Sequence, residues 1–263
     1  MMSELVLEQV SVRLGGRVIV DDLSFTARAG EVTAIIGPNG SGKSTTMKGL
    51  SGETRYQGRA RLNGREINQT PAVEMASYRA VLPQHGTITF PMTVSEVVSL
   101  GFHARRREPA LIGEALARVG LDGFGGRFFE TLSGGEQQRT QLARVLVQIW
   151  EPVRGGKPCW LFLDEPVSSL DIHHQIQIMD LAHAYARAGG GVLAVMHDLN
   201  LTAMYADQVV ALRGGQCLAA GPARETLTGP ILSAVYGCPL AVNEAPRDDT
   251  PFILPHLARS SGA

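Results

Sequence analysis

The run Gly37-Pro-Asn-Gly-Ser-Gly-Lys-Ser-Thr45 is the feature that most restricts how this chain folds. It matches the pattern Gly-x-x-x-x-Gly-Lys-Ser/Thr, a glycine-rich loop whose backbone N–H groups surround phosphates. The loop follows a short β-prone run at 31–36 and precedes residues 44–50, which contain no proline. This order of strand, loop and helix distinguishes a phosphate-binding loop (P-loop) from an ordinary glycine-rich turn. The sequence therefore predicts an α/β fold with a phosphate site at the end of a strand.

Each residue type in this loop suits contact with a nucleotide. The glycines let the backbone approach the phosphates, Lys43 reaches the β- and γ-phosphates, and the Ser44 hydroxyl is a ligand for Mg²⁺. We predict that the nucleotide is bound by Gly37, Pro38, Asn39, Gly40, Ser41, Gly42, Lys43, Ser44 and Thr45.

A second serine- and glycine-rich turn, Leu132-Ser-Gly-Gly-Glu-Gln-Gln-Arg139, opens a helix later in the chain. A helix N-terminus presents unpaired N–H groups and the positive end of the helix dipole to an anion. A single nucleotide pocket needs only one such loop around its phosphates. The simplest role for the second turn is contact with a γ-phosphate held by another copy of the chain. The pair therefore predicts a nucleotide-driven dimer.

The run Trp160-Leu-Phe-Leu163 is uniformly apolar, as expected of a strand buried on both faces of a parallel sheet. It ends in Asp164 and Glu165, and ligands of open α/β sheets bind at the carboxyl ends of the strands. Because successive strand residues point to opposite sides, the two acids are expected to have different roles. We predict that Asp164 organises Mg²⁺ and that Glu165 orients and deprotonates the attacking water. The alternative is a pair of solvated acids at the start of a loop.

Together these motifs resemble the ATP-binding subunit of an ABC transporter, and their order fits along nearly the whole chain. Leu132-Ser-Gly-Gly135 is close to the signature motif of that family, which is far more specific than the P-loop. The resemblance implies an α/β fold with a P-loop NTPase (ABC ATPase) core, an antiparallel β edge and an inserted helical subdomain. It also implies that Ser133, Gly134 and Gly135 act in trans on the ATP of the partner copy.

Three further positions take their roles from the resemblance. Gln84 corresponds to the glutamine linked to Mg²⁺ and to coupling, and His197 to the switch histidine that contacts the γ-phosphate. The turn Ser168-Ser-Leu-Asp171 corresponds to the one that crosses to the partner subunit. The cofactors are expected to be ATP and Mg²⁺. The predicted catalytic residues are Lys43, Gln84, Glu165 and His197, and the predicted metal ligands are Ser44, Gln84 and Asp164.

One position departs from the family pattern. ABC subunits usually place an aromatic residue upstream of the P-loop, where it stacks on adenine, and Leu14 stands at that place here. Leucine covers a purine face by apolar contact but lacks the stacking contribution of about 0.5–1.5 kcal/mol that aromatic pairs add. Arg13 and Val18 are candidates to compensate for this loss.

We interpret residues 1–263 as one ABC ATPase domain. Alternating apolar residues at 3–35 resemble the antiparallel β edge, and the segment 148–158 is expected to be a surface insertion. The predicted parts are a β/α ATP-binding core at 1–85 and 131–220, a helical subdomain at 86–130 and a C-terminal tail at 221–263.

Composition limits the partners and the compartment. The net charge of −1 predicts no nucleic-acid partner. Three cysteines without metal-ligand spacing fit a reducing compartment. The sequence shows no signal peptide and no apolar run near the roughly 18–20 residues that span a bilayer. The family resemblance then implies a peripheral subunit at the cytoplasmic face of the bacterial inner membrane, with a separate permease dimer and, indirectly, an extracytoplasmic solute-binding protein as partners.

The cargo is inferred from resemblance alone. Residues 87–101 are similar to the coupling segment of importers for iron-siderophores, cobalamin and haem, and residues 133–175 look most like haem (hemin) importer ATPases. We expect segment 86–105 to dock on the permease, with Phe90 and Met92 either in contact with it or in the subdomain core. Ferric-siderophore or cobalamin import is the alternative, and a soluble ABC ATPase acting on DNA or ribosomes is a more remote one.

Overall fold

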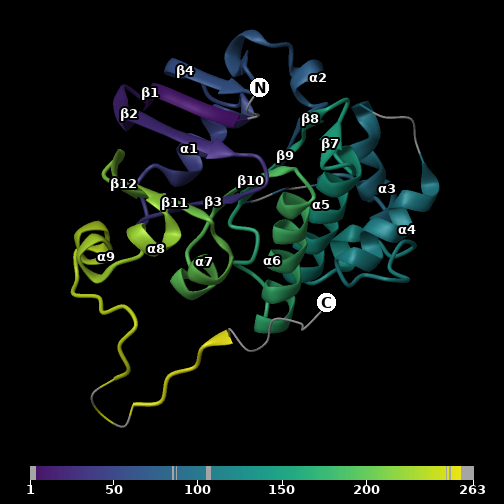
Figure 1. Ribbon diagram of the computed structural model, residues 1–263. Coiled ribbons are helices and arrows are strands. Elements are labelled where there is room, and N and C mark those ends of the chain that lie inside the picture. The colour runs from purple at the N-terminus through teal and green to yellow at the C-terminus, as the bar shows by residue number, and fades with distance from the viewer. Residues whose placement is uncertain are drawn as a thin grey trace.

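A computed structural model describes residues 4–84, 86, 88–104, 108–246, 248 and 250–255 of the chain. Two sheets lie one above the other, with helices below and to one side of the larger sheet (Figure 1). Residues 87 and 105 of the expected permease-docking segment and residues 247, 249 and 256–263 of the expected tail lie outside the described part.

The larger sheet has six strands in the order β12-β11-β3-β10-β9-β6. All neighbouring pairs are parallel except β11 and β12, which pair antiparallel at one edge. The predicted α/β class with a parallel central sheet is therefore confirmed. The strands are β3 (Val32–Ile36), β6 (Arg79–Leu82), β9 (Trp160–Asp164), β10 (Gly191–Val195), β11 (Gln208–Arg213) and β12 (Gln216–Pro222).

The central strands are buried on both faces, as the uniformly apolar run at 160–163 predicted. Alternate side chains enter different cores, because successive residues of a strand point to opposite faces. On β9, Leu161 and Leu163 join the core beneath the sheet, whereas Trp160 and Phe162 join the core above it. The sheet thus separates a helix-covered core from a second core under the smaller sheet.

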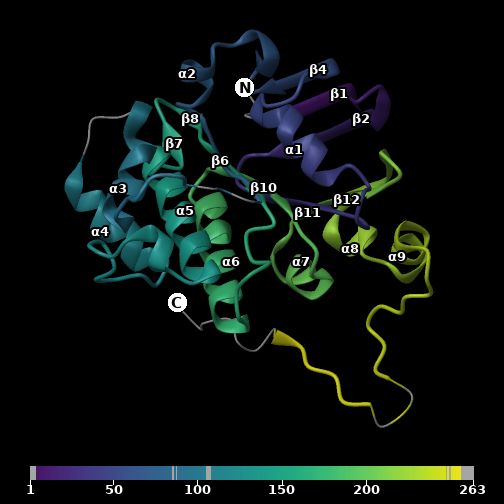
Figure 2. The ribbon, with the colours of Figure 1, turned by 180° about the vertical axis from the view of Figure 1, so that it is seen from behind.

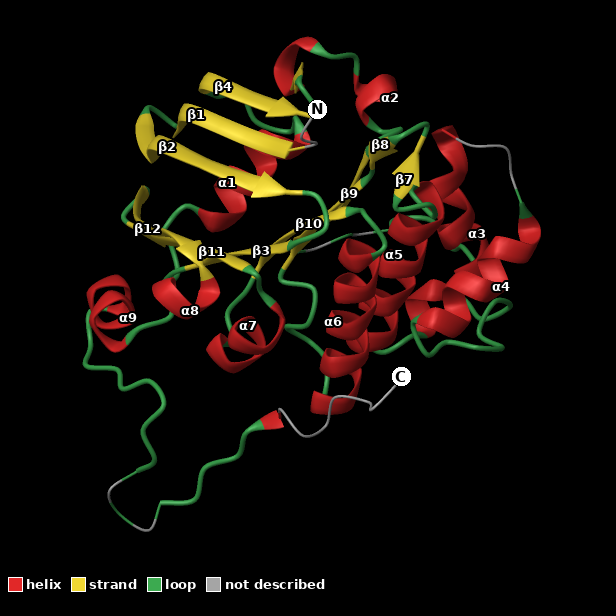
Figure 3. Cartoon of the chain, in the orientation of Figure 1, coloured by secondary structure: helices red, strands yellow, loops and turns green. Residues whose placement is uncertain are grey.

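The smaller sheet is antiparallel, with the order β2-β1-β4-β5. Its strands are β1 (Glu4–Leu14), β2 (Arg17–Arg28), β4 (Gln57–Leu62) and β5 (Arg65–Glu66). Helix α1 (Lys43–Ser51) contacts β1 and β2 on one side and β9 and β10 on the other (Figure 3). Its residues Met47 and Leu50 fill the core between the two sheets. This sheet corresponds to the antiparallel β edge expected at the start of the chain.

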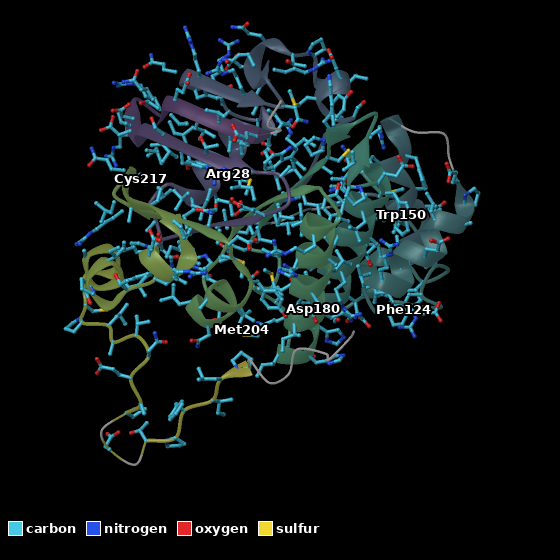
Figure 4. The ribbon with its side chains drawn as sticks, in the orientation of Figure 1. Arg28, Phe124, Trp150, Asp180, Met204 and Cys217 are labelled. Carbon is cyan, nitrogen blue, oxygen red and sulfur yellow. The ribbon has the colours of Figure 1, made fainter. Side chains whose placement is uncertain are left out.

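A group of helices stands beside the core and forms the right side of Figure 1. The group contains α3 (Val94–Ser99), η2 (Leu100–Ala104), α4 (Pro109–Arg118), η3 (Phe129–Thr131) and α5 (Gly134–Gln148). Helices α3 and α4 and η2 all pack on α5. Helix α5 therefore supplies the surface on which the other helices of the group are buried. Figure 4 labels Phe124 and Trp150 there, and the Arg118 guanidinium lies 3.9 Å from the centre of the Trp150 ring.

The remaining helices cover the lower face of the large sheet, as the view from behind also shows (Figure 2). They are α6 (Ile172–Arg187), α7 (Leu199–Tyr205), α8 (Ala223–Thr226) and α9 (Gly229–Tyr236). The small elements η1 (Ile67–Gln69) and α2 (Ala72–Met75) connect the smaller sheet to β6. Segment 148–158, expected as an insertion, contains the hairpin of β7 (Val153–Arg154) and β8 (Lys157–Pro158).

Two expectations from composition can be compared with the structure. Within the described residues, none of the helices has the length and hydropathy needed to cross a bilayer. Cys159, Cys217 and Cys238 are all described, and none of the three takes part in a disulfide bond. The exact boundaries of the core, helical subdomain and tail stay a prediction.

Candidate active site

The loop from residue 37 to residue 45 joins β3 to α1, at the carboxyl end of the parallel strand. Gly37 and Gly42 have φ angles of 149° and 102°, in the region that favours glycine. A Cβ on Gly37 would lie 2.2 Å from the carbonyl oxygen of Leu212, and one on Gly42 would lie 3.0 Å from that of Ile19. The loop therefore needs glycine for two reasons, its backbone conformation and its close approach to β11 and β2.

Lys43 is buried at the first position of α1. Its ammonium donates to the carbonyl oxygens of Gly37 at 2.8 Å and Pro38 at 3.0 Å. Burial lowers the pKa of Lys43, while the nearby carboxylates of Glu165 and Asp164 act in the opposite direction. The Lys43 side chain thus folds back over its own loop and donates to neutral carbonyl oxygens. A phosphate anion would bind its positive charge more strongly than these carbonyls do.

Two of the predicted metal ligands, Ser44 and Asp164, are in contact although they lie 120 residues apart in the sequence. The Ser44 hydroxyl donates to Oδ1 of Asp164 at 3.2 Å. Asp164 is buried, and burial raises its pKa although the bond from Ser44 opposes this. Because burial disfavours the ionised form of Asp164, a bound cation would stabilise its carboxylate.

The third predicted ligand, Gln84, lies just beyond β6. It shares a pocket of about 200 Å³ with Asp164 and Lys48. Hydroxyl, amide and carboxylate oxygens are the hard donors that Mg²⁺ prefers, and Mg²⁺ keeps several waters of its own. The donor set at Ser44, Asp164 and Gln84 therefore fits Mg²⁺. Within the described residues, there is no cluster of three His, Cys, Asp or Glu side chains suited to a transition metal.

Glu165 and His197 form the closest side-chain pair of the site. His197 Nε2 lies 2.6 Å from Oε1 of Glu165, across 32 positions in sequence. His197 comes two residues after the end of β10, the neighbour of β9, so both side chains leave the same edge of the sheet. The two predicted catalytic residues are therefore brought together.

The direction of Glu165 has a cause that the sequence analysis did not anticipate. We expected Glu165 to point away from Asp164 because residues alternate along a strand, but β9 ends at Asp164. Glu165 instead has a φ of +53°, in the left-handed region, and its N–H donates to the Val195 carbonyl at 3.2 Å. A strained turn, not strand alternation, sets its direction.

The signature-like turn stands apart from this cluster. The exposed Ser133 caps α5: its hydroxyl accepts from the Glu136 N–H at 3.3 Å, while the Glu136 carboxylate accepts from the Ser133 N–H at 2.7 Å. Gly134 is exposed, and a Cβ on Gly135 would lie 3.2 Å from the Ser169 carbonyl. Across the described residues, no hydrogen bond joins the turn at 133–135 to the P-loop. The Ser133 N–H is thus paired within the turn, while Gly134 is exposed to solvent away from the P-loop.

Leu14 and Val18 lie at the turn end of the β1–β2 hairpin, and each is 43% exposed. The same hairpin approaches the P-loop, since Ile19 lies against Gly42. Two exposed aliphatic side chains are therefore available near the phosphate site to cover an adenine. Their role as a base-contacting surface stays a prediction.

One residue near the site received no role in the sequence analysis. The Gln138 amide, on α5, donates to the carbonyl oxygen of Glu165 at 2.9 Å. Gln138 stands inside the run 132–139, whose pattern indicates a helix N-terminus and carries no information about a partner 27 residues away. No local signal could have found this contact.

The sequence model of the ABC transporter family matches residues 20–168, more than half of the chain. The chain belongs to this family. The family of ABC ATPases binds and hydrolyses ATP, and the P-loop of this member lies inside the matched range.

Two curated relatives match almost the whole chain. Both are named hemin import ATP-binding protein HmuV. The one from Jannaschia sp. (strain CCS1) is 55% identical over 260 residues, covering 98% of this chain and 96% of the relative. The one from Rhizobium johnstonii is 56% identical over 257 residues, covering 95% of this chain and 97% of the relative.

Solved structures support the fold. An ATP-binding subunit of an ABC transporter is similar with a TM-score of 0.76 and 22% identity, covering 91% of this chain and 96% of that one. An ATP-binding cassette of an ABC transporter in its ADP conformation has a TM-score of 0.75 at 22% identity, covering 89% and 98%. The predicted ABC ATPase fold is therefore confirmed.

Proposed function

We propose that this chain hydrolyses ATP to power a membrane importer of haem. The observation that carries the proposal is the near full-length identity of 55% and 56% to two proteins named for hemin import. The arrangement of Lys43, Asp164, Glu165 and His197 around one P-loop supports ATP hydrolysis as the source of energy.

The P-loop and Lys43 would bind and orient the triphosphate. On binding, the Lys43 ammonium exchanges the carbonyl oxygens of Gly37 and Pro38 for β- and γ-phosphate oxygens. Ser44, Asp164 and Gln84 would hold Mg²⁺, which when bound neutralises charge that develops on the phosphates. The buried Asp164 then remains ionised beside a cation.

Glu165 would act as the general base. Its carboxylate accepts a proton from water as the water oxygen bonds to the γ-phosphorus, and the bond to the bridging oxygen of ADP breaks. His197, 2.6 Å from Oε1, restrains the carboxylate at the edge of the sheet and is itself expected to reach the γ-phosphate. The pair thus places the proton acceptor and a γ-phosphate contact side by side.

The complete site would need a second copy of the chain. The N-terminus of α5 is exposed at Ser133 and Gly134, and its N–H groups suit an anion supplied from outside the protomer. In a head-to-tail dimer, Ser133, Gly134 and Gly135 of one copy would contact the ATP on the P-loop of the other.

The dimer is expected to bind a permease dimer at the cytoplasmic face of the bacterial inner membrane. An extracytoplasmic solute-binding protein would deliver the cargo to that permease. Phe90 is 75% exposed, which suits the permease contact that we expected of it, whereas Met92 packs partly buried against the helical core. The two residues that were paired as candidates therefore differ, and Phe90 alone is proposed as a permease contact.

Cargo can be tested in the host. We expect deletion of the gene to abolish growth with haem as the sole iron source, and the wild-type gene to restore it. A gene carrying Glu165→Gln should express the protein but fail to restore growth. Normal growth of the deletion strain on haem, with loss of siderophore or cobalamin use, would move the assignment to one of those cargoes.

The chemistry can be tested separately with the purified protein. Glu165→Gln should keep ATP binding and lose turnover, because the amide cannot accept the proton. Turnover close to wild type in this variant would remove Glu165 from the role of general base while leaving the cargo assignment untouched.

A further inference from the structure

The backbone of Glu165 is held from three sides. Its N–H donates to Val195, and its carbonyl oxygen accepts from the Gln138 amide at 2.9 Å and from the Ser168 hydroxyl at 3.2 Å. The same residue has a φ of +53°, a conformation that a side-chain-bearing residue keeps only when its surroundings enforce it. These bonds are therefore candidates for the restraint that directs the Glu165 carboxylate toward His197.

Of these three partners, Gln138 alone comes from the helical group. Ser168 lies three residues from Glu165 in the same turn, and Val195 belongs to the neighbouring strand β10. Gln138 instead lies on α5, the helix on which α3, η2 and α4 pack. The Gln138 side chain is thus a direct link from the helical group to the residue proposed as general base.

Gln138 also borders the groove between the helical group and the core. The groove has a volume of about 530 Å³, and its lining includes Gln84, Gly86, Phe90 and Gln138. The amide oxygen Oε1 of Gln138 is buried and accepts no hydrogen bond from the described residues. One end of this amide therefore holds Glu165, while the other end has no partner within the described chain to keep it in place.

We propose that Gln138 is a positioning residue for hydrolysis, which transmits the placement of α5 to the carboxylate of Glu165. The inference rests on the proposed role of Glu165 as general base. When the 2.9 Å bond is made, the left-handed turn is held and the carboxylate faces the γ-phosphate position. When α5 shifts away from the core, the turn loses this donor and the carboxylate loses its direction.

The kinetic signature follows from where Gln138 acts. Within the described part of the chain, Gln138 forms no hydrogen bond with the P-loop, so ATP affinity should not depend on it. Misplacement of a reacting group by about 1 Å can lower a rate by roughly a hundredfold. We therefore expect a loss of kcat of about tenfold to a hundredfold, with KM and ATP affinity near wild type.

The test compares two glutamines of the same helix. Gln138→Met keeps the side-chain volume and removes the donor. The matched control is Gln148→Met, because the Gln148 amide also joins α5 to the core, donating to the carbonyls of Ala76 and Arg79 at 2.9 Å each. Both variants lose a tether of α5, but only Gln138→Met loses one that ends at Glu165.

We expect kcat to fall in Gln138→Met and to stay near wild type in Gln148→Met, in steady-state ATPase assays with nucleotide titrations alongside. Gln138→Glu, which has the same shape but no N–H donor, should show the same loss, and it serves if the Met variant does not fold. Unchanged kcat in a folded donor-less variant would overturn the inference. An equal loss of kcat in the Gln148 variant would also overturn it.

A double-mutant cycle sharpens the assignment. Ser168→Ala removes the other side-chain donor to the same carbonyl, so its effect on kcat should not be additive with that of Gln138→Met. Additive effects would contradict a shared action through Glu165. Glu165→Gln is assayed in parallel: if it retains turnover, the proposed base is wrong, whereas if it stalls while Gln138→Met is normal, only the present inference fails.

Discussion

Replacing Lys43 with methionine should weaken ATP binding and leave the stability of the ATP-free protein nearly unchanged. The ammonium of Lys43 donates to the carbonyls of Gly37 and Pro38 at 2.8 and 3.0 Å. Those bonds must be exchanged for phosphate contacts when ATP binds. The net effect of the lysine on affinity is therefore smaller than the sum of its final contacts.

The magnitude can be worked from this exchange. A hydrogen bond to a charged group contributes about 1.5–3 kcal/mol, and every 1.4 kcal/mol is about a tenfold change in affinity. Because two carbonyl bonds are given up, we expect the lower part of this range. Lys43→Met should weaken ATP binding by about tenfold to a hundredfold.

The stability of the ATP-free protein should respond differently. Burial lowers the pKa of Lys43 from 10.5, so its ionised form is disfavoured in the folded state at every pH below the lowered pKa. Removing that charge offsets the loss of the two carbonyl bonds. The ATP-free melting temperature is expected to change little at neutral pH.

The assay is a nucleotide titration by calorimetry, with thermal melts in the presence and absence of ATP. At ATP concentrations well above Kd, a tenfold loss of affinity lowers the ligand-induced stabilisation by about 1.4 kcal/mol. Lys157→Met, on the hairpin β7–β8, is the control for loss of a lysine elsewhere. An affinity within about threefold of wild type, in a folded Lys43→Met protein, would refute the reasoning.

Three further outcomes are expected. Gly191→Ala should lower the free energy of unfolding by about 1–3 kcal/mol in a denaturant titration, because its Cβ would lie 2.3 Å from the fully buried ring of Trp160; an unchanged midpoint would contradict this. Asp164→Asn should abolish hydrolysis yet stabilise the ATP-free protein above the raised pKa of Asp164, where burial disfavours the carboxylate. This gain should vanish as pH falls below 3.8, so a gain independent of pH would argue against burial as its cause. Ser133→Ala should lower the free energy of unfolding by about 1 kcal/mol in thermal melts, because the α5 cap is lost. The hydrogen bonds with Ser133 lower the pKa of Glu136, so in this variant that pKa should move back toward its ordinary value, which titration of Glu136 by NMR would check.

The amino-acid sequence by itself determined the parts of the site that depend on short stretches of chain. The glycine-rich loop at 37–45 predicts its own strand–loop–helix setting, because backbone conformation and phosphate contact both depend on consecutive residues. The run Trp160-Leu-Phe-Leu163 predicted a doubly buried strand, because apolar residues at every position can only be covered on both faces. The start of α5 at Ser133 could also be predicted from neighbouring residues, because a capping box spans one helical turn.

Only the tertiary structure decided which of these parts meet, and how. Ser44 contacts Asp164 across 120 positions, and His197 contacts Glu165 across 32, because parallel strands bring their carboxyl ends to one edge of the sheet. The direction of Glu165 comes from a left-handed turn, where strand alternation had been expected. The link from Gln138 to that turn depends on how α5 packs against the core, and contacts between distant segments leave no periodic or local pattern in the chain.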